Sequence, residues 1–400
     1  MAKLLEITGK AISGEWGQDD DSGTGIPVLR TTNFTNEGFV NYKNVVTRSI
    51  TKKNIAEKYL RHGDIIIEKS GGSDKQPVGR VIFFEGEENK YLFNNFTGLL
   101  RIQNMEEWFP KYVFYALYAH YRNGGTRAFE NRTTGLHNLQ VDNYVKSVDV
   151  PKFSYQEQQH ICKTLDHVRD AVAYREQQLS KLDELVKARF VEMFGDPATS
   201  PMGWFQTTIG QECYSIKDGP HKSLIDVGKE NGHPFISVRN IVKGYIDFST
   251  AKYISDVDYK EAIKKCCPEK GDILYSKGGT TGIAKLVDVD IKFANWVHLA
   301  VLKFNHSEFN GTFFENMLNC DYCYSQSQML TKGIANRDLV LSAMAQIKIY
   351  KPPILLQNQF AAFVEEVDKS KLLVGSAVAH KPFDIDFFSK STVQRPIKEV

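Results

Sequence analysis

Two carboxylates and a lysine occur close together at Asp64, Glu68 and Lys69, on a short apolar segment that is predicted to be a strand. Metal-dependent nucleases use clustered carboxylates of this kind to hold a divalent cation. A similar segment later in the chain has Asp272 and Lys277 but lacks the second carboxylate. The comparison argues against a nuclease, which stays only as an alternative with a cryptic metal site, and it favours turn roles for Asp64 and Asp272.

Cysteines offer a second possible metal site, because Cys320 and Cys323 have the two-residue gap of a zinc-ligand pair. The other pair, Cys266 and Cys267, is adjacent in sequence, and adjacent ligands strain tetrahedral coordination. Buried free thiols therefore explain these residues better than zinc does. Six cysteines in 400 residues are also too few for a disulfide scaffold, which predicts a reducing, cytoplasmic location.

Motifs of nucleotide and methyl-transfer chemistry do not appear. The glycines at 278–282 are followed by Lys285 at the wrong spacing for a phosphate-binding loop. The Pro352-Pro353 pair follows Lys351 and precedes Ile354, so it does not form the Asn/Asp-Pro-Pro-aromatic tetrapeptide of amino-methyltransferases. We expect no catalytic centre, no metal and no cofactor on this chain, and we expect the proline pair to link a domain to a helix.

Composition is that of a globular protein, with 42% hydrophobic and 24% charged residues. No apolar run has the length of a membrane span, and the N-terminal residues show no secretory pattern, so we expect no membrane association. The net charge is only +2. A strongly basic chain would indicate nucleic acid directly, whereas here any such binding must come from local placement of charge.

Six segments recur in the same order at an interval of about 200 residues. Any one match could be chance, but six in register indicate that the chain consists of two copies of one unit. The matched segments are 25–33 with 232–240, 63–66 with 271–274, 69–72 with 276–279, 93–96 with 293–296, 135–139 with 333–336, and Pro151, Gln156 and Gln158 with Pro352, Gln357 and Gln359.

Each copy begins with about 150 residues of short β-branched and aromatic runs bounded by Gly, Asn and Ser, which predict a mixed domain with many short strands. A helix follows, because no Pro or Gly occurs between Tyr155 and Phe194 and apolar residues recur at heptad spacing. At 1.5 Å per residue, this helix is a rod of about 60 Å. The seam residues are Ile161, Leu165, Val168, Val172, Leu179, Leu182, Val186 and Phe190 in the first copy and Phe360, Phe363 and Val367 in the second.

A long apolar seam on a helix must pack against another apolar surface. Each helix could pack on its own domain, but duplication favours two helices lying antiparallel, with the two domains related by a pseudo-twofold axis. The predicted boundaries are 1–153 for the first domain, 154–196 for the first helix, 197–353 for the second domain, 354–380 for the second helix and 381–400 for a tail.

Two mixed domains, each followed by a helix led by Pro-x-x-x-x-Gln-x-Gln, resemble the specificity subunit of type I restriction–modification systems. The end of the first helix, Phe190-Val191-Glu192-Met193-Phe194-Gly195-Asp196-Pro197, is similar to the central conserved region of that family. The resemblance implies an α+β fold in which two mixed α/β target-recognition domains are separated by an antiparallel coiled coil of two long helices conserved in the family. The second helix is shorter than the first, and the tail has no counterpart in the first copy.

The resemblance also implies a non-catalytic subunit that reads double-stranded DNA, each domain recognising one half of a bipartite asymmetric sequence. The helices would set the spacer and dock two adenine-methyltransferase (modification) subunits, and through them a restriction/translocase subunit. S-adenosylmethionine, ATP and Mg would act in those partner subunits. A coiled-coil scaffold without a DNA role is the remaining alternative, and the glycine-containing polar loops argue mildly against it.

DNA binding needs basic and amide side chains on exposed loops, because phosphate contacts supply affinity and base-edge contacts supply sequence readout. Three loop regions in each copy carry such residues. In the first copy the candidates are Arg30, Thr31, Asn33, Lys69, Ser70, Lys75, Arg127, Arg132, Thr133 and His137. In the second copy they are Arg239, Asn240, Lys277, Thr280, Thr281, Lys332, Asn336 and Arg337.

Residues that recur in both copies are expected to serve the fold, because readers of different half-sites should differ where they contact bases. Arg127, Arg132, His137 and Arg337 do not recur and are therefore the sharper base-reading candidates. Gln156, Gln158 and Gln357 lie at helix starts, where we expect them to cap the helix or contact a modification subunit. The small net charge predicts weak DNA binding by this chain alone and stronger binding once the modification subunits join.

Overall fold

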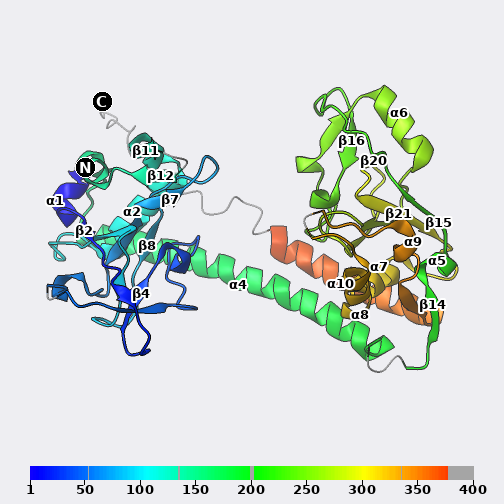
Figure 1. Ribbon diagram of the computed structural model, residues 1–400, viewed down its shortest axis with the longest axis horizontal. Coiled ribbons are helices and arrows are strands. Elements are labelled where there is room, and N and C mark those ends of the chain that lie inside the picture. Colours follow the sequence, from blue (N-terminus) through cyan, green and yellow to red (C-terminus); the bar gives the residue numbers. More distant parts are fainter. Residues whose placement is uncertain (53, 134–135, 199–201, 335, 377–400) are drawn as a thin grey trace, which may run out of the picture. The chain divides into compact units, whose positions relative to one another are not determined.

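The computed structural model describes residues 1–376 except positions 53, 134–135, 199–201 and 335. The chain divides into two compact units, here called unit 1, which contains Met1–Tyr174, and unit 2, which begins at Arg175. Each unit combines short strands with helices, so the α+β prediction is confirmed (Figure 1). Among the described helices, none combines the length and the apolarity needed to cross a bilayer.

Unit 1 is organised around an antiparallel sheet with the strand order β2-β10-β6-β8. A second sheet has the order β3-β5-β4-β9, a third the order β11-β12-β7, and β1 pairs with β13. The strands are β1 (Ala2–Lys3), β2 (Ile12–Ser13), β3 (Gln18–Asp19), β4 (Ile26–Leu29), β5 (Val46–Ser49), β6 (Ile65–Glu68), β7 (Ser70–Gly72), β8 (Val81–Phe83), β9 (Leu92–Phe93), β10 (Thr97–Leu100), β11 (Glu130–Thr133), β12 (Leu136–Leu139) and β13 (Asp149–Val150). The helices are α1 (Leu4–Thr8), α2 (Pro110–Arg122) and α3 (Val141–Ser147).

Unit 2 repeats most of this organisation, although β3 and the β11-β12-β7 sheet have no counterpart among its described strands. The order β15-β21-β18-β19 matches β2-β10-β6-β8, β17-β16-β20 matches β5-β4-β9, and the pair β14-β22 matches β1-β13. The strands are β14 (Phe205–Thr208), β15 (Cys213–Asp218), β16 (His233–Ile236), β17 (Lys252–Ile254), β18 (Ile273–Ser276), β19 (Ala284–Leu286), β20 (Ala294–Asn295), β21 (Leu299–Phe304) and β22 (Lys348–Lys351). The helices are α5 (Ile209–Glu212), α6 (Asp256–Lys265), α7 (Gly311–Asn319), α8 (Asp321–Leu330), α9 (Leu341–Met344) and α10 (Ile354–Ser376).

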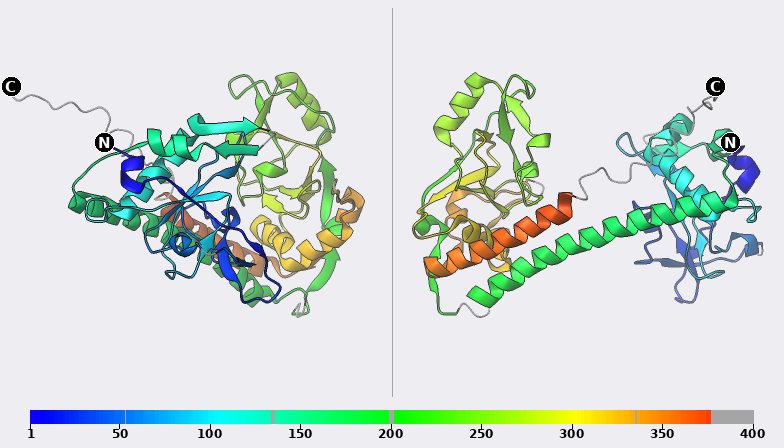
Figure 2. Two further views of the ribbon diagram at one scale, coloured as in Figure 1. Left: turned by 60° about the vertical axis from the view of Figure 1, so that its left-hand side comes forward. Right: turned by 180° about the vertical axis from the view of Figure 1, so that it is seen from behind.

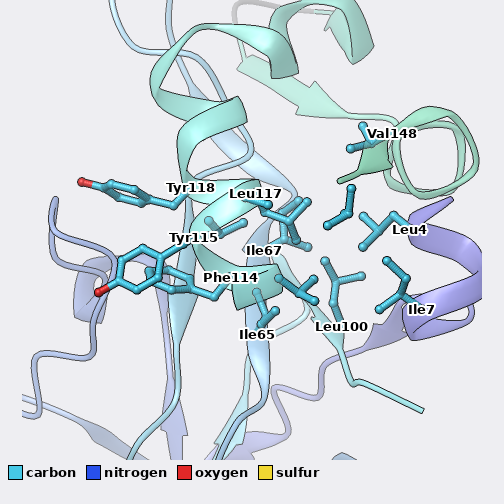
Figure 3. Close-up of a cluster of buried hydrophobic side chains, with 14 of the residues drawn as sticks. Leu4, Ile7, Ile65, Ile67, Leu100, Phe114, Tyr115, Leu117, Tyr118 and Val148 are labelled. Carbon is cyan, nitrogen blue, oxygen red and sulfur yellow. The ribbon is translucent and has the colours of Figure 1, made fainter. Parts of the chain in front are cut away.

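The central strands are buried on both faces, and their side chains alternate between two cores. Ile65 and Ile67 of β6 pack under helix α2, whereas Ile66 joins the cluster on the other face. Figure 3 shows Phe114 and Leu117 of α2, with Leu4 of α1, converging on the first of these cores. Strand β18 divides its side chains between two cores in the same way. The period of two along a strand explains why these runs are apolar at every position.

Helix α4 (Tyr155–Phe194) begins and ends where local sequence chemistry requires. Ser154 and Glu157 form a capping box, in which the Ser154 amide donates to Glu157 Oε2 at 2.8 Å and the Glu157 amide donates to Ser154 Oγ at 3.3 Å. Gly195 follows the last turn with a positive φ of 75°, and Pro197 prevents a return to helix. The helix belongs to unit 1 up to Tyr174 and to unit 2 thereafter.

One buried glutamine fixes the start of each long helix to its own domain. The Phe109 amide donates to Gln158 Oε1 at 2.8 Å, and Gln158 Nε2 donates to the carbonyls of Glu107 and Phe153. Gln357 repeats the arrangement, with the Asn310 amide as donor and the carbonyls of Glu308 and Pro352 as acceptors. Both glutamines are fully buried.

Of the two roles expected for Gln158 and Gln357, capping the helix start or contacting a modification subunit, burial excludes the second. Their amide groups already satisfy backbone atoms of the adjoining domain, and no surface remains for a partner. Gln156, by contrast, is exposed.

The second half of α4 packs against α10 within unit 2 (Figure 2). The Phe360 ring lies 5.5 Å from that of Phe190, and Lys371 Nζ lies 2.8 Å from Asp183 Oδ1. Residue numbers rise along one helix as they fall along the other, so the pair is antiparallel, as the duplicated seam predicts. The seam residues in this core are Leu182, Val186, Phe190, Phe360, Phe363 and Val367.

The seam in the first half of α4 behaves differently. Ile161 and Leu165 pack against the core of unit 1. Val168 is 47% exposed, and Val172 and Leu179 are half-buried. The heptad pattern therefore marks domain packing at both ends of α4 and a less covered stretch between them.

Candidate nucleic-acid interface

Two of the three polar loop regions meet in each unit. In unit 1, strand β12 pairs with β7, which places Asn138 opposite Ser70, and the Leu139 amide donates to the Lys69 carbonyl at 2.8 Å. In unit 2, the Leu339 amide donates to the Lys277 carbonyl at 2.7 Å. Segments about 70 residues apart are thus joined into one polar surface by the same hydrogen bond in both units.

A further loop borders this surface and was missed by the sequence analysis. The Lys69 amide donates to the Phe96 carbonyl at 2.8 Å, and the Lys277 amide donates to the His298 carbonyl at 2.9 Å. These bonds make Phe96 equivalent to His298 and Asn94 equivalent to Trp296, two residues away from the match of 93–96 with 293–296 inferred from sequence. Phe96 is 54% exposed. No lysine adjoins Phe96 in the sequence, so its position next to Lys69 is visible only in the structure.

The asparagines of the first loop region are structural. Asn33 is 1% exposed, accepts a hydrogen bond from the Arg30 amide at 3.0 Å and donates to the Asn41 carbonyl at 3.0 Å. Asn240 is equally buried, accepts from the Ser237 amide at 2.9 Å and donates to the Asp247 carbonyl at 3.0 Å. We therefore correct the expectation that these asparagines contact DNA, because their amide groups are used inside a turn.

Three other DNA-binding candidates are also buried. Thr281 is 1% exposed, and its hydroxyl lies 2.9 Å from that of Thr331. His137 is 6% exposed, with Nδ1 at 3.0 Å from Glu130 Oε2. Lys277 is also 6% exposed. These side chains hold the loops together, so base contacts are no longer expected from them.

Lys69 and Lys277 occupy the same backbone position in the two units but have different charged neighbours. Lys277 Nζ lies 3.2 Å from Asp338 Oδ1 and 3.5 Å from Asp218 Oδ2. The strand pairings place Ser13 where unit 2 has Asp218, and the matched leucine amide bonds place Asn138 where unit 2 has Asp338. Lys69 accordingly meets a hydroxyl, with Nζ at 3.4 Å from Ser13 Oγ. Desolvation, followed by the charge of Lys58, lowers the pKa of Lys69.

A second set of candidates remains exposed. Arg127 donates from Nη2 to the Asp74 carbonyl at 3.2 Å, and Arg337 donates to Gln328 Oε1, so each guanidinium is partly oriented by its own unit. The exposed candidates are Lys75, Arg127, Thr280, Lys332, Asn336 and Arg337. Arg30, Thr31, Lys69, Ser70 and Arg239 are half-buried. Arg132 and Thr133 belong to strand β11, and their side chains lie outside the described part of the structure.

The suspected nuclease residues have structural partners. Asp64 accepts from the Arg61 amide at 2.7 Å and pairs with Arg101 at 2.6 Å, whereas Asp272 accepts from the Glu269 amide and pairs with Lys303. Both are turn residues, as the sequence predicts. Burial raises the pKa of the Glu68 carboxyl group against the opposing effect of Arg80.

Possible metal ligands do not gather among the described residues. No group of three or more His, Cys, Asp or Glu side chains in that part of the chain is placed to hold an ion. Cys266 and Cys323 are buried free thiols, and Cys267 and Cys320 are half-buried. The geometry thus supports the interpretation of the cysteines as free thiols.

Comparison with known proteins points to one family. The model of the type I restriction modification DNA specificity domain matches residues 219–374. The type I restriction enzyme MjaIX specificity subunit of Methanocaldococcus jannaschii is 23% identical over 317 residues, which cover 72% of this chain and 66% of that protein. The matched region therefore spans just under two thirds of this relative.

Solved structures show the same fold. The S subunit of a type I restriction-modification system from M. genitalium superimposes with a TM-score of 0.55 at 16% identity, covering 99% of this chain and 96% of that one. A chain from a study of complex assembly and conformational transition of the type I R-M system gives a TM-score of 0.52 at 16% identity, covering 98% and 94%. The comparisons therefore show that this chain is similar to the specificity subunits of type I restriction–modification systems.

Proposed function

We propose that this chain is the DNA sequence-specificity subunit of a type I restriction–modification complex. Each unit reads one half of a bipartite asymmetric sequence. The chain supplies recognition, and methyl transfer and cleavage belong to partner subunits. The observation that carries the proposal is the repeated scaffold. The two units share the strand order of the main sheet and the glutamine anchors, but the side chains of their matched loops differ.

Differences at shared positions support recognition of two unlike half-sites. Phe96 and Asn94 of unit 1 are replaced by His298 and Trp296 in unit 2, in loops held by the same backbone hydrogen bonds. Because sequence is read by side chains that reach base edges, two similar scaffolds with unlike loops are expected to read unlike sequences. A scaffold protein without a DNA role would not need such divergence beside a lysine-bearing loop.

The test is to sequence modified adenines in a host that carries this gene together with its methyltransferase genes. We expect one bipartite asymmetric motif, which disappears when this gene alone is deleted. A catalytically inactive methyltransferase provides the matched control, because it removes methylation while this chain is still present. A motif that persists without this chain would refute the proposal, and so would metal-dependent DNA cleavage by the purified chain.

The long helices are proposed to set the gap between the half-sites and to dock two modification subunits. Four residues inserted after Tyr174 add about 6 Å to a continuous helix and keep its faces nearly aligned. Since base pairs are about 3.4 Å apart, the methylated motif should gain one or two base pairs of spacer with both half-sites unchanged. Altered half-sites, or an unchanged spacer, would contradict this role for α4.

A further inference from the structure

Helix α8 of unit 2 begins with two cysteines that lie three residues apart. Cys320 is the residue that precedes the first turn of α8, and Cys323 lies within that turn. Helical geometry puts two Cα atoms at this spacing about 5 Å apart, within the range of about 4.4–6.8 Å that a disulfide spans. Both thiols are free. The two-residue gap that suggested a zinc-ligand pair therefore also fits a dithiol that can close to a disulfide.

The two cysteines differ in exposure. Cys323 is fully buried in the main core of unit 2, and its thiol donates to the Lys348 carbonyl at 3.5 Å. Cys320 packs at the border of the same core and is half-buried. One cysteine thus keeps a surface that a small molecule can reach, whereas the other lies inside the core behind it.

The surroundings of the pair also separate the acidities of the two thiols. The Cys323 thiol, followed by the backbone amides of Cys323 and Tyr322, lowers the pKa of Cys320 against the opposing effects of burial and Asp321. Burial raises the pKa of Cys323 well above its ordinary value, and Cys320 adds to this effect. The thiolate is the reactive form of cysteine, so Cys320 is the nucleophile of the pair.

The common scaffold does not require this pair, because unit 1 lacks it. Helices α2 and α7 begin at equivalent positions, since the amide of the residue before each donates to the anchoring glutamine. Helix α2 then continues without a break over Pro110–Arg122, whereas in unit 2 helices α7 and α8 meet at Cys320. Cys162 is the one cysteine within residues 1–174, and it is buried. The dithiol is therefore a feature of the second domain alone.

We propose that Cys320 and Cys323 form a redox-active dithiol, which exchanges with a low-molecular-weight disulfide and closes to a disulfide across the first turn of α8. The Cys320 thiolate attacks one sulfur of the small disulfide, which forms a mixed disulfide and releases one small thiolate. Cys323 then loses its proton and attacks Cys320 Sγ, and the second small thiolate leaves. The protein dithiol is oxidised by two electrons, the small disulfide is reduced to two thiols, and these take up the two protons. This site goes beyond the proposed function and does not depend on it.

The test uses the full chain, purified with its thiols reduced and then equilibrated with glutathione and glutathione disulfide in varied ratios. Trypsin releases residues 304–332 as one peptide, which contains both cysteines of the pair and none of the other four. After free thiols have been alkylated, mass spectrometry distinguishes the alkylated dithiol from the disulfide, which is two hydrogen atoms lighter than the unmodified peptide. We expect the disulfide form to increase with the proportion of glutathione disulfide and to disappear on treatment with dithiothreitol.

Cys266 and Cys267 provide a control within the same chain. Burial raises the pKa of Cys266 to about 12 and also raises that of Cys267, and the Cys266 thiol donates to the Lys217 carbonyl at 3.3 Å. Both should stay reduced in the same buffers. At pH 7, iodoacetamide should modify Cys320 about tenfold faster than Cys267, which is also half-buried, because one unit of pKa changes the thiolate fraction tenfold.

Two serine variants separate the steps of the exchange. Cys323→Ser should accumulate a mixed disulfide of glutathione with Cys320, because no second thiol is present to displace it. Cys320→Ser should leave Cys323 unmodified, since that thiol is buried. Both variants should fold, because serine is a favoured residue before a helix and its hydroxyl can replace the Cys323 thiol as a donor to the Lys348 carbonyl. Circular dichroism of each variant measures this.

A peptide 304–332 that stays reduced at every ratio would overturn the proposal. So would equal oxidation of Cys266 and Cys267, because the reaction would then reflect general unfolding. Absence of glutathione on Cys320 in folded Cys323→Ser, or its presence on Cys323 in folded Cys320→Ser, would overturn it as well. If a variant does not fold, the wild-type peptide still decides. None of these outcomes bears on the proposed function, which the methylation experiment tests separately.

Discussion

Lys69 and Lys277 occupy the same backbone position in the two units but have unlike surroundings. The backbone amides of Lys69 and Lys277 donate to the carbonyls of Phe96 and His298. The carbonyls of the two lysines accept from the amides of Leu139 and Leu339. Unit 2 surrounds its lysine with Asp218 and Asp338, whereas unit 1 has neutral Ser13 and Asn138 there. Two carboxylates therefore compensate the charge of Lys277 within its unit, whereas Lys69 has neutral residues at these two positions.

The lesson is that a shared residue type does not imply a shared role. The sequence match of 69–72 with 276–279 sets Lys69 against Ser276, and only the backbone hydrogen bonds of the structure make Lys69 equivalent to Lys277. Duplication preserves the backbone hydrogen bonds, because a sheet tolerates few alternatives, while side chains at the loop edges are free to change. Differences in charge at matched positions therefore select the residues to test for DNA binding.

The largest expected effect concerns how the long helices pack. Phe360 is fully buried between Phe190 and Phe194, whereas its counterpart Ile161, three residues after the anchoring glutamine, is half-buried. Phe360→Ala should destabilise unit 2 by about 3–5 kcal/mol, and Ile161→Ala should cost unit 1 less than about 2 kcal/mol. Hydrogen exchange of peptides from each unit, followed through urea unfolding, measures the two effects separately. Equal losses of stability would show that the starts of α4 and α10 are packed equally tightly on their own units.

The lysine comparison is tested by replacing each lysine with methionine, which keeps the length of the side chain. Lys277→Met should destabilise unit 2 by about 2–3 kcal/mol, because two carboxylates lose a buried cation. The cost is limited because Lys265 still pairs with Asp218 at 2.6 Å. Lys69→Met should leave stability unchanged and weaken DNA binding by the assembled complex about tenfold.

The effects of the two lysine variants on stability and on DNA binding, taken together, test the roles assigned to Lys69 and Lys277. If Lys277→Met weakens DNA binding without loss of stability, or if Lys69→Met unfolds unit 1 without affecting binding, the assigned roles are reversed. Lys75→Met is a useful control for unit 1, because Lys75 is an exposed cation on the same loop.

Substitution of Gln158 and Gln357 tests whether the two glutamine anchors contribute equally to the stability of their units. Gln158→Leu and Gln357→Leu each leave a backbone amide and two carbonyls without their partners, so each should cost about 2 kcal/mol in its own unit. The neighbouring exposed residues Gln156 and Gln359 supply matched leucine variants that should change stability by less than about 0.5 kcal/mol. Calorimetric unfolding of the four variants is the measurement. A large loss for one anchor only would mean that the repeat is not energetically symmetric.

Much of this architecture was predictable from the sequence. The heptad seam and the absence of Pro and Gly predict helix α4 with its observed limits, and the ordered matches predict a repeated mixed domain. Periodicity reports burial along an element, which is why these predictions succeed. Asp64 and Asp272 were also correctly explained as turn residues.

The residues of the interface were harder to predict, because polarity in a sequence does not distinguish exposed from internally bonded side chains. Asn33, Asn240, Lys277 and Thr281 have the types that bind DNA, yet each is bonded inside its unit. Phe96 was missed for the opposite reason, since an aromatic residue is usually expected in a core, whereas Phe96 is 54% exposed. Both kinds of error concern tertiary partners that no local pattern encodes.

The smallest expected effect concerns acid stability, in which the two units should behave alike. Asp20 in unit 1 accepts from Ser22 Oγ at 2.6 Å, and the Ser22 hydroxyl is the main reason why its pKa falls to about 2. In unit 2, the hydrogen bonds from Ser249 and Lys243 lower the pKa of Asp247 to about 2. Both values lie below the ordinary 3.8, so each carboxylate stabilises its unit above pH 4, and the contribution disappears as the pH falls from about 4 to 2.

Replacing either aspartate by asparagine should therefore lower stability at pH 5 and have a smaller effect at pH 2.5. The measurement is the urea midpoint of the corresponding unit at the two pH values, with Asp21→Asn as a control, since Asp21 is exposed and adjacent to Asp20. Because the carboxylate loses its charge in acid, only the neutral hydrogen bonds remain to be disturbed at the lower pH. A loss of equal size at both pH values would mean that turn geometry, and not ionisation, is what each aspartate contributes.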